Sequence, residues 1–232
     1  MLIKLDIKTN LEPLLDEIKD ITWDSKNRCL INRPTGHWLY DSYEILPKWK
    51  NTALAKFLES LPFEIGEARL MKLSPGECYP AHADIDNRYH LNLTGNDQCF
   101  LIDLNTNKMH TVINDGFLYY MDAGIRHTAV NFGDCDRIQL VIREPLPKVY
   151  DLSNMINLNI KFVDTKFNFR YEFDKHISPV INKMLASEEI GWFNPISETE
   201  MEVTTTQSGM HFLFEEFRKS KLKFFTAITE NA

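Results

Sequence analysis

Between Glu64 and Glu144 the chain consists of short apolar segments separated by turn residues. Typical turns are Pro75-Gly76 and Asn114-Asp115-Gly116, because proline, asparagine and glycine favour tight reversals of the chain. No helical pattern long enough to connect two parallel strands lies between the segments, so we expect antiparallel strands. The pattern predicts a β-sandwich or barrel rather than βαβ units. The predicted strands are Ala68–Leu73, Tyr89–Leu93, Phe100–Leu104, Met109–Ile113, Phe117–Met121, His127–Phe132 and Ile138–Ile142.

Helical patterns precede this region. Apolar residues at helical spacing predict a helix over residues 11–18, with Pro13 tolerated in its first turn. Asn51 is the predicted N-cap of a second helix, over residues 54–61. We therefore expect short helices to flank the N-terminal side of the barrel.

A pair of prolines, Pro145 and Pro147, marks a change after the last predicted strand. We expect the barrel domain to occupy residues 1–148 and a helical C-terminal region to occupy residues 149–232. The helical signals in that region are apolar periods over 177–185 and 211–225 and a capping-box pattern formed by Ser197 and Glu200.

The charge balance argues against two classes of partner. The 232 residues include 33 acidic and 26 basic side chains, which gives a net charge of −7. A nonspecific nucleic-acid binder needs a cationic face, and an anionic membrane surface would repel this chain. No apolar run approaches the length that crosses a bilayer. We therefore expect neither nucleic acid nor membrane as a partner; the oligomeric state is left open.

The cysteines and the N-terminus suggest a reducing compartment. Cys29, Cys78, Cys99 and Cys135 are far apart and form no CxxC motif, so we expect free thiols rather than a zinc site or a disulfide framework. Residues 1–10 alternate charged and apolar side chains without a continuous apolar core, unlike a signal peptide. The expected location is the cytoplasm.

A metal-ligand pattern follows the first predicted strand. His82 and Asp84 are two residues apart, so in an extended segment both side chains point to the same side. His127 begins a later predicted strand and supplies a third ligand if the two segments lie close together. Two histidines and one carboxylate on one face of a metal are typical of non-haem Fe(II) oxygenases. An HxD sequence alone is weak evidence, and a surface His–Asp pair is the alternative.

Arg137 strengthens this interpretation. It follows His127 by ten residues and starts a strand in which Ile138, Leu140 and Ile142 face one side. The odd-numbered residues then face the other side, toward the barrel interior. A buried guanidinium needs an anionic partner, which a dicarboxylate can supply through a bidentate contact. The alternative is a surface arginine at a strand edge.

Taken in order, these motifs resemble the 2-oxoglutarate/Fe(II)-dependent oxygenases, and most closely the aspartyl/asparaginyl β-hydroxylases and free-proline hydroxylases. The resemblance covers about a third of the chain, from Ala68 to Glu144. It implies a mainly β protein with a double-stranded β-helix (jelly-roll, cupin-like) core, N-terminal helices and a C-terminal helical region. The matching pieces are His82-Ala83-Asp84, Arg88-Tyr89-His90, Tyr120–Gly124, His127–Phe132 and Arg137.

The resemblance also implies roles for individual residues. His82, Asp84 and His127 would be the catalytic Fe(II) ligands. Arg137 would bind the distal carboxylate of 2-oxoglutarate. Arg88 and His90, an Arg-x-His pair, would also contact this cosubstrate. For His90 the alternative is a histidine that belongs to the core. The implied cosubstrates are 2-oxoglutarate and O2, with ascorbate as an accessory reductant, and the implied substrate is a small amino acid or a peptide side chain of the aspartyl/asparaginyl or prolyl type.

Two features separate this chain from parts of the family. Asp84 is present, whereas some β-hydroxylases lack the metal carboxylate and halogenases need that position vacant. The serine that helps to hold the cosubstrate in the β-hydroxylase branch has no counterpart near Met71 and Lys72. The full triad therefore resembles the free-amino-acid hydroxylases more closely than the protein hydroxylases.

Two other functions stay open at this point. Arg143 follows Arg137 by six residues on the same face of the strand, a spacing similar to that of nucleic-acid demethylases of the same superfamily. The acidic charge and the Arg88–His90 pair count against that branch. A cupin-like barrel that binds a metal or small ligand without catalysis is the non-enzymatic alternative, but it has no need for a buried arginine. Three aromatic residues, Trp38, Tyr40 and Tyr43, either line the substrate entrance or belong to the core.

Overall fold

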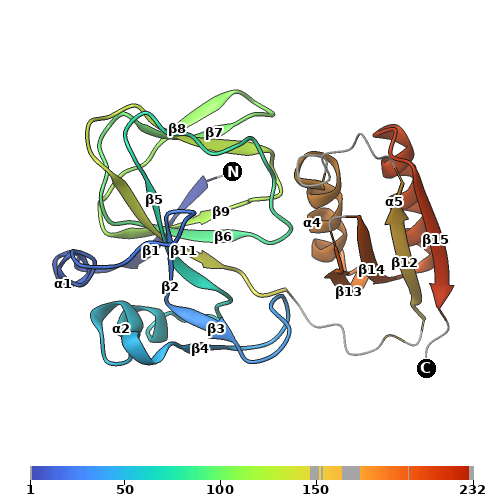
Figure 1. The fold of residues 1–232 in the computed structure, drawn as a ribbon, viewed down its shortest axis with the longest axis horizontal. Helices are drawn as coiled ribbons and strands as arrows, with labels where there is room; N and C mark the ends of the chain where they lie inside the picture. The colour runs from blue at the N-terminus through green and yellow to red at the C-terminus, as the bar shows by residue number, and fades with distance from the viewer. Residues whose placement is uncertain (1, 147–151, 153, 164–172, 198, 230–232) are drawn as a thin grey trace. The chain divides into compact units, whose positions relative to one another are not determined.

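The computed structural model describes residues 2–146, 152, 154–163, 173–197 and 199–229 (Figure 1). Its contacts divide the chain into two compact units. The first contains Met1–Ala81 and Asp86–Pro145, and the second contains Leu146–Ala232 together with the short segment His82–Ile85. No helix among the described residues is long and apolar enough to cross a membrane.

The larger sheet of the first unit has six antiparallel strands in the order β1-β9-β6-β11-β5-β2. Four of the predicted strands lie in this sheet, where they are β5, β6, β9 and β11. The observed ends of each strand lie within one residue of the predicted ends. Strand β11 is central because it pairs with β5 on one side and β6 on the other. The bounds are β1 Leu2–Lys8, β2 Arg28–Leu30, β5 Ala68–Leu73, β6 Arg88–Asn92, β9 Phe117–Met121 and β11 Arg137–Arg143.

The smaller sheet has the order β10-β7-β8, with β7 at Cys99–Asp103, β8 at Lys108–Thr111 and β10 at His127–Asn131. A bridge between Cys78 and Val130 adds a short segment beside β10. Figure 1 shows β7 and β8 across the barrel from β6 and β9. From β5 onward the chain switches repeatedly between the two sheets, which makes this unit a double-stranded β-helix, or jelly roll. The predicted fold class is confirmed.

Helices α1, Glu12–Glu17, and α2, Ala53–Glu59, supply apolar side chains to the core on the outer face of the larger sheet. In α2, Leu54 and Leu58 belong to the same core cluster as Leu140. Two short strands and a 3₁₀ turn complete this side of the barrel. They are β3 Asn32–Pro34, β4 Tyr43–Ile45 and η1 Pro47–Trp49.

The cap of α2 differs from the prediction. Thr52, not Asn51, accepts a hydrogen bond from the Ala55 amide, at 3.1 Å. Asn51 instead adopts a positive φ of 69°, a conformation that asparagine tolerates better than most residues. Glu17 of α1 also accepts a bond from the Leu54 amide, at 2.9 Å. Two side chains therefore satisfy the free amides at the start of α2.

The second unit is built on a four-stranded antiparallel sheet in the order β13-β14-β12-β15. Helix α4 lies over nearly the predicted range, but the sheet was not predicted. The helix expected over 211–225 is α5, which starts earlier and ends at Lys219. The bounds are β12 Ile156–Phe162, the π-helical turn η2 Phe173–Ile177, α4 Ser178–Ala186, β13 Ile190–Pro195, β14 Glu200–Thr205, α5 Gln207–Lys219 and β15 Phe224–Thr229.

Two local predictions in this unit are wrong. Ser197 and Glu200 form no capping box; the Ser197 amide donates to the Glu200 carbonyl at 3.1 Å, between β13 and β14. Phe224 lies in a strand because the helix stops at Ser220 and Lys221 takes a positive φ of 58°. Its ring still packs against Phe217 of α5, at 5.3 Å between centroids. The aromatic spacing was therefore a packing signal rather than a continuation of the helix.

Candidate metal centre and inner face of the barrel

The structure brings together the three residues predicted to bind metal. One ligand atom each from His82, Asp84 and His127 lies within 4.8 Å of the other two. His82 Nε2 and Asp84 Oδ2 are 4.0 Å apart, as the i, i+2 spacing predicts for an extended segment. His127 begins β10 and is 4% exposed, whereas the other two side chains are half-buried.

The donor set fits a divalent transition metal. The Nδ1 atom of His127 lies 2.7 Å from the Ile125 carbonyl oxygen, so Nδ1 carries the proton and Nε2 keeps the lone pair that a metal needs. Adjacent ligands on an octahedral ion, at about 2.1 Å each, lie about 3 Å apart. The three donors are therefore close to the required separation, and a carboxylate with two imidazoles suits Fe(II).

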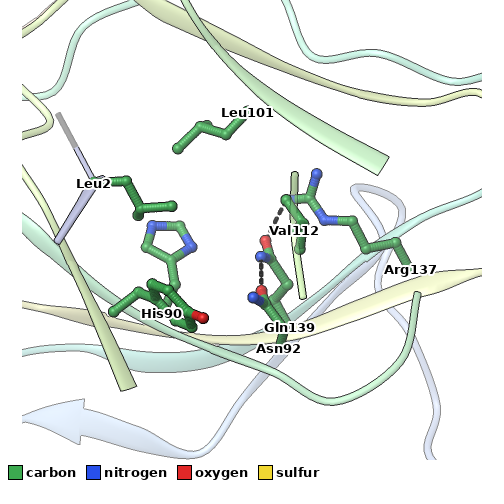
Figure 2. A pocket seen from close by; sticks show the side chains of 8 residues that line it. Leu2, His90, Asn92, Leu101, Val112, Arg137 and Gln139 are labelled. Atoms are coloured by element: carbon green, nitrogen blue, oxygen red, sulfur yellow. Dashed lines mark hydrogen bonds between the residues drawn. The ribbon is translucent and has the colours of Figure 1, made fainter. Parts of the chain in front are cut away.

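A row of polar side chains lines the barrel interior (Figure 2). Alternation along β11 points Arg137 and Gln139 inward, and alternation along β6 does the same for His90 and Asn92. A cavity of about 10 Å³ lies among them, room for about one water molecule. It is lined by Leu2, His90, Asn92, Leu101, Val112, Tyr119, Arg137 and Gln139.

Arg137 is the predicted anchor of the cosubstrate, and it is buried with 3% of its surface exposed. Its guanidinium donates to the amide oxygen of Gln139, and Gln139 in turn donates to Asn92. The Arg137 Nη1 atom has no hydrogen-bond partner, and no carboxylate pairs with this arginine within the described part of the chain. Burial lowers the pKa of Arg137. A cation with only a neutral partner is costly in a protein interior.

His90 lies on the same inner face and is buried. Burial lowers its pKa to about 3, with further lowering by the positive charge of Arg137. The imidazole is therefore neutral near pH 7, and its Nε2 has no hydrogen-bond partner among the described residues. A neutral ring with a spare nitrogen is able to meet a ligand, but whether His90 contacts the cosubstrate stays a prediction.

Arg88 makes an ion pair that the sequence analysis missed. Its guanidinium contacts Asp86, which is 2% exposed, and Arg143 contacts the second oxygen of the same carboxylate. The pairing of β6 with β11 places Arg88 directly opposite Arg143. Asp86 precedes Arg88 by two residues, so the i, i+2 argument used for His82 and Asp84 could have identified it.

Two further predicted candidates are now placed. Trp38 lies over the Arg143 guanidinium, 4.2 Å from ring centroid to Cζ, and its carbonyl accepts from the Tyr43 hydroxyl at 2.7 Å. Asn131 is fully buried and donates to the Leu73 and Cys135 carbonyls at 2.9 and 2.8 Å. These bonds tie Asn131 to the end of β5 and to the turn that follows β10.

The double-stranded β-helix and its His–Asp–His cluster define a barrel protein with a candidate non-haem metal centre. The family model for aspartyl/asparaginyl beta-hydroxylase matches residues 15–145, which is more than half of the chain. The chain therefore belongs to the aspartyl/asparaginyl β-hydroxylase family, and it is a hydroxylase-type oxygenase in general terms.

Comparison with solved structures gives weak likenesses. A crystal structure of CapF with the inhibitor 3-isopropenyl-tropolone is 17% identical, with a TM-score of 0.30; the match covers 46% of this chain and 39% of that one. A cupin 2 conserved barrel domain protein from Rhodopseudomonas palustris is also 17% identical, with a TM-score of 0.29, over 57% of this chain and 88% of that one. Both scores are too low for any inference about function. No curated protein matches the chain.

Proposed function

We propose that the protein is a 2-oxoglutarate- and Fe(II)-dependent dioxygenase that hydroxylates an amino acid or a peptidyl side chain. The observation that supports this most directly is Arg137, a buried guanidinium on the inner face of the barrel with a neutral amide as its hydrogen-bond partner. An anionic ligand would offset the cost of burying that charge. A dicarboxylate cosubstrate supplies such an anion.

His82, Asp84 and His127 would hold the metal. Iron bound there supplies the redox chemistry that couples oxidation of 2-oxoglutarate by O2 to hydroxylation of the substrate. The bond from His127 Nδ1 to the Ile125 carbonyl fixes the ring and its tautomer. Three protein ligands would leave part of the metal's coordination sphere to other ligands, such as the cosubstrate.

Arg137, Gln139 and Asn92 would hold the distal carboxylate. The chain of bonds from Arg137 through Gln139 to Asn92 continues to the Ile113 carbonyl, at 2.8 Å, and so fixes the direction of the guanidinium. Neutral His90 adds no second positive charge to this part of the barrel. Because the cavity holds about one water, binding of a five-carbon dicarboxylate requires its lining side chains to move.

The test is a titration without oxygen. We expect Fe(II) and 2-oxoglutarate together, but neither alone, to produce the weak visible charge-transfer band of the ternary complex. Arg137→Met should weaken the band at a given 2-oxoglutarate concentration, and Asp84→Asn should remove it. Absence of the band in wild-type protein that has bound metal would contradict the proposal, as would equal binding of 2-oxoglutarate by Arg137→Met.

The structure offers less support for the two alternatives. The second arginine expected for a nucleic-acid demethylase, Arg143, contacts Asp86. A cupin-like protein that only binds a metal or small ligand would not need the buried guanidinium of Arg137. All four cysteines are free thiols, which supports the cytoplasmic location that we propose.

A further inference from the structure

A second cationic site lies on the inner face of the larger sheet. Arg69 of β5 is paired with Val141, and Arg143 of β11 is paired with Arg88 of β6. Directly opposed residues in adjacent strands point to the same side of a sheet. These arginines therefore share the face that carries Arg137, but they lie toward the opposite ends of the strands.

Arg69 has an unused donor at this site. Asp86 serves both Arg88 and Arg143, so one carboxylate is shared by two guanidiniums. Glu67 contacts Nη1 of Arg69, but the buried Nε of Arg69 has no hydrogen-bond partner among the described residues. Burial lowers the pKa of Arg69, and the positive charges of Arg88 and Arg143 lower it further. An anion bound here would reduce the repulsion between the guanidiniums and would accept a hydrogen bond from Nε of Arg69.

Two aromatic residues shape the site. The Trp38 ring stacks on the Arg143 guanidinium and limits its rotation. Tyr43, whose hydroxyl donates to the Trp38 carbonyl at 2.7 Å, lies close enough to Arg143 for that charge to affect it, and burial raises the pKa of its phenol. A guanidinium plane held in this way suits a carboxylate, which accepts paired hydrogen bonds in one plane.

This site is separate from the one at Arg137. Arg137 and Arg143 are six residues apart on β11, which corresponds to about 20 Å along an extended strand. The carboxylates of a five-carbon dicarboxylate are no more than about 6 Å apart. Because this separation along the backbone is much longer than the ligand, we assign the ligand at Arg69 and Arg143 to a second molecule rather than to 2-oxoglutarate.

We propose that Arg69 and Arg143 bind the free carboxylate of the substrate, and that the substrate is a free amino acid rather than a residue inside a peptide. The inference rests on the proposed oxygenase function. Glu67 and Asp86, which flank the two arginines, suit the ammonium group of the same zwitterion. A residue inside a peptide carries neither charge on its backbone.

The first experiment compares charge states of the substrate on wild-type protein. Succinate formation is measured with Fe(II), 2-oxoglutarate and each of the protein amino acids, and then with the C-terminal amide of each active one. We expect the amide to lower kcat/KM by at least about tenfold, since a charged hydrogen-bond partner is lost. Equal activity of amide and acid, or activity with peptides alone, would overturn the inference.

The second experiment tests the site itself. Arg69→Met should raise the KM of the active amino acid by at least about tenfold, with 2-oxoglutarate affinity little changed; Arg69→Lys should recover part of the loss. Arg33→Met is the control, because Arg33 is an exposed arginine paired with Glu44. An unchanged KM in Arg69→Met would exclude Arg69 from substrate binding.

The outcomes also separate the inference from the function on which it rests. If wild-type protein binds 2-oxoglutarate but no free amino acid stimulates succinate formation, the inference fails and the oxygenase proposal stands. If 2-oxoglutarate does not bind at all, the oxygenase proposal itself fails. A poorly folded Arg69→Met variant leaves the acid–amide comparison intact, because that comparison uses wild-type protein.

Discussion

Replacing Arg137 by methionine should weaken cosubstrate binding strongly while costing the free protein little or no stability. Methionine has a similar length but no charge, so it removes the guanidinium without leaving a large cavity. If the role of Arg137 were structural, its side chain would stabilise the fold, and its replacement should lower the free energy of unfolding. A side chain kept for a ligand can be removed from the free protein at little cost, because in the free protein its charge has no carboxylate partner.

The magnitudes follow from the contacts of Arg137. Replacing buried charges by apolar groups of similar volume is often neutral or stabilising by about 1–4 kcal/mol. Against this, Gln139 loses the donor to its amide oxygen, a cost of about 1 kcal/mol. The net change in the free energy of unfolding should therefore lie between about 1 kcal/mol of destabilisation and about 3 kcal/mol of stabilisation. Loss of a bidentate charged contact should weaken 2-oxoglutarate binding by about 2–4 kcal/mol, or roughly 30- to 1000-fold.

Two measurements on the same preparation test this reasoning. Urea unfolding of the ligand-free protein gives the change in stability, and anaerobic calorimetric titration with Mn(II) and 2-oxoglutarate gives the affinity. Arg33→Met, at an exposed arginine, should change neither value. The reasoning would be refuted if Arg137→Met lost more than about 2 kcal/mol of stability while its affinity for 2-oxoglutarate stayed at the wild-type value.

Three other outcomes are expected. Asp84→Asn should abolish the thermal stabilisation that Mn(II) gives the wild-type protein, about 2.7 kcal/mol at 100 times Kd; a retained shift would exclude Asp84 as a ligand. The pKa of His90 is about 3 in the folded protein, below its value in the unfolded chain. As the pH falls, the unfolded chain therefore binds a proton at His90 before the folded protein does. The free energy of unfolding should fall below about pH 6.5, by up to about 1.4 kcal/mol per pH unit. His90→Gln should show a shallower decline in urea unfolding, and equal slopes would contradict this. Asp86→Asn should cost about 3–5 kcal/mol in urea unfolding, because Arg88 and Arg143 lose their shared carboxylate; a loss below about 1 kcal/mol would show the cluster to be dispensable.

The strands from β5 to β11 could be predicted closely because their signals are local. Apolar alternation and turn residues lie within each segment, as in β5 and β9, whose ends match the prediction. The triad could be predicted for a related reason, since the spacing of His82 and Asp84 fixes their common side. The metal-ligand role of these residues remains a prediction.

Other features depend on contacts that the sequence does not display. Strand β1 pairs with β9, more than a hundred residues away, and no local signal names that partner. In the second unit, the end of α5 depends on a positive φ at Lys221, a residue type that gives no warning of it. The shared ion pair of Asp86 required the register that sets Arg88 opposite Arg143. Register between distant strands is a property of the assembled sheet.

Strand β11 divides stability and proposed chemistry between its two faces. Leu140 and Ile142 point outward into the core that α1 and α2 cover, where burial of apolar surface stabilises the fold. Arg137 and Arg143 point inward, where two buried guanidiniums cost free energy unless anions meet them. The outward face therefore stabilises a strand whose inward face carries buried charges that cost free energy. Asp86 offsets that cost at Arg143. No acidic residue among the described ones does so at Arg137. Arg143 thus has a protein carboxylate beside it in the free protein and Arg137 has none among the described residues, which is why Asp86→Asn should cost stability whereas Arg137→Met should cost little.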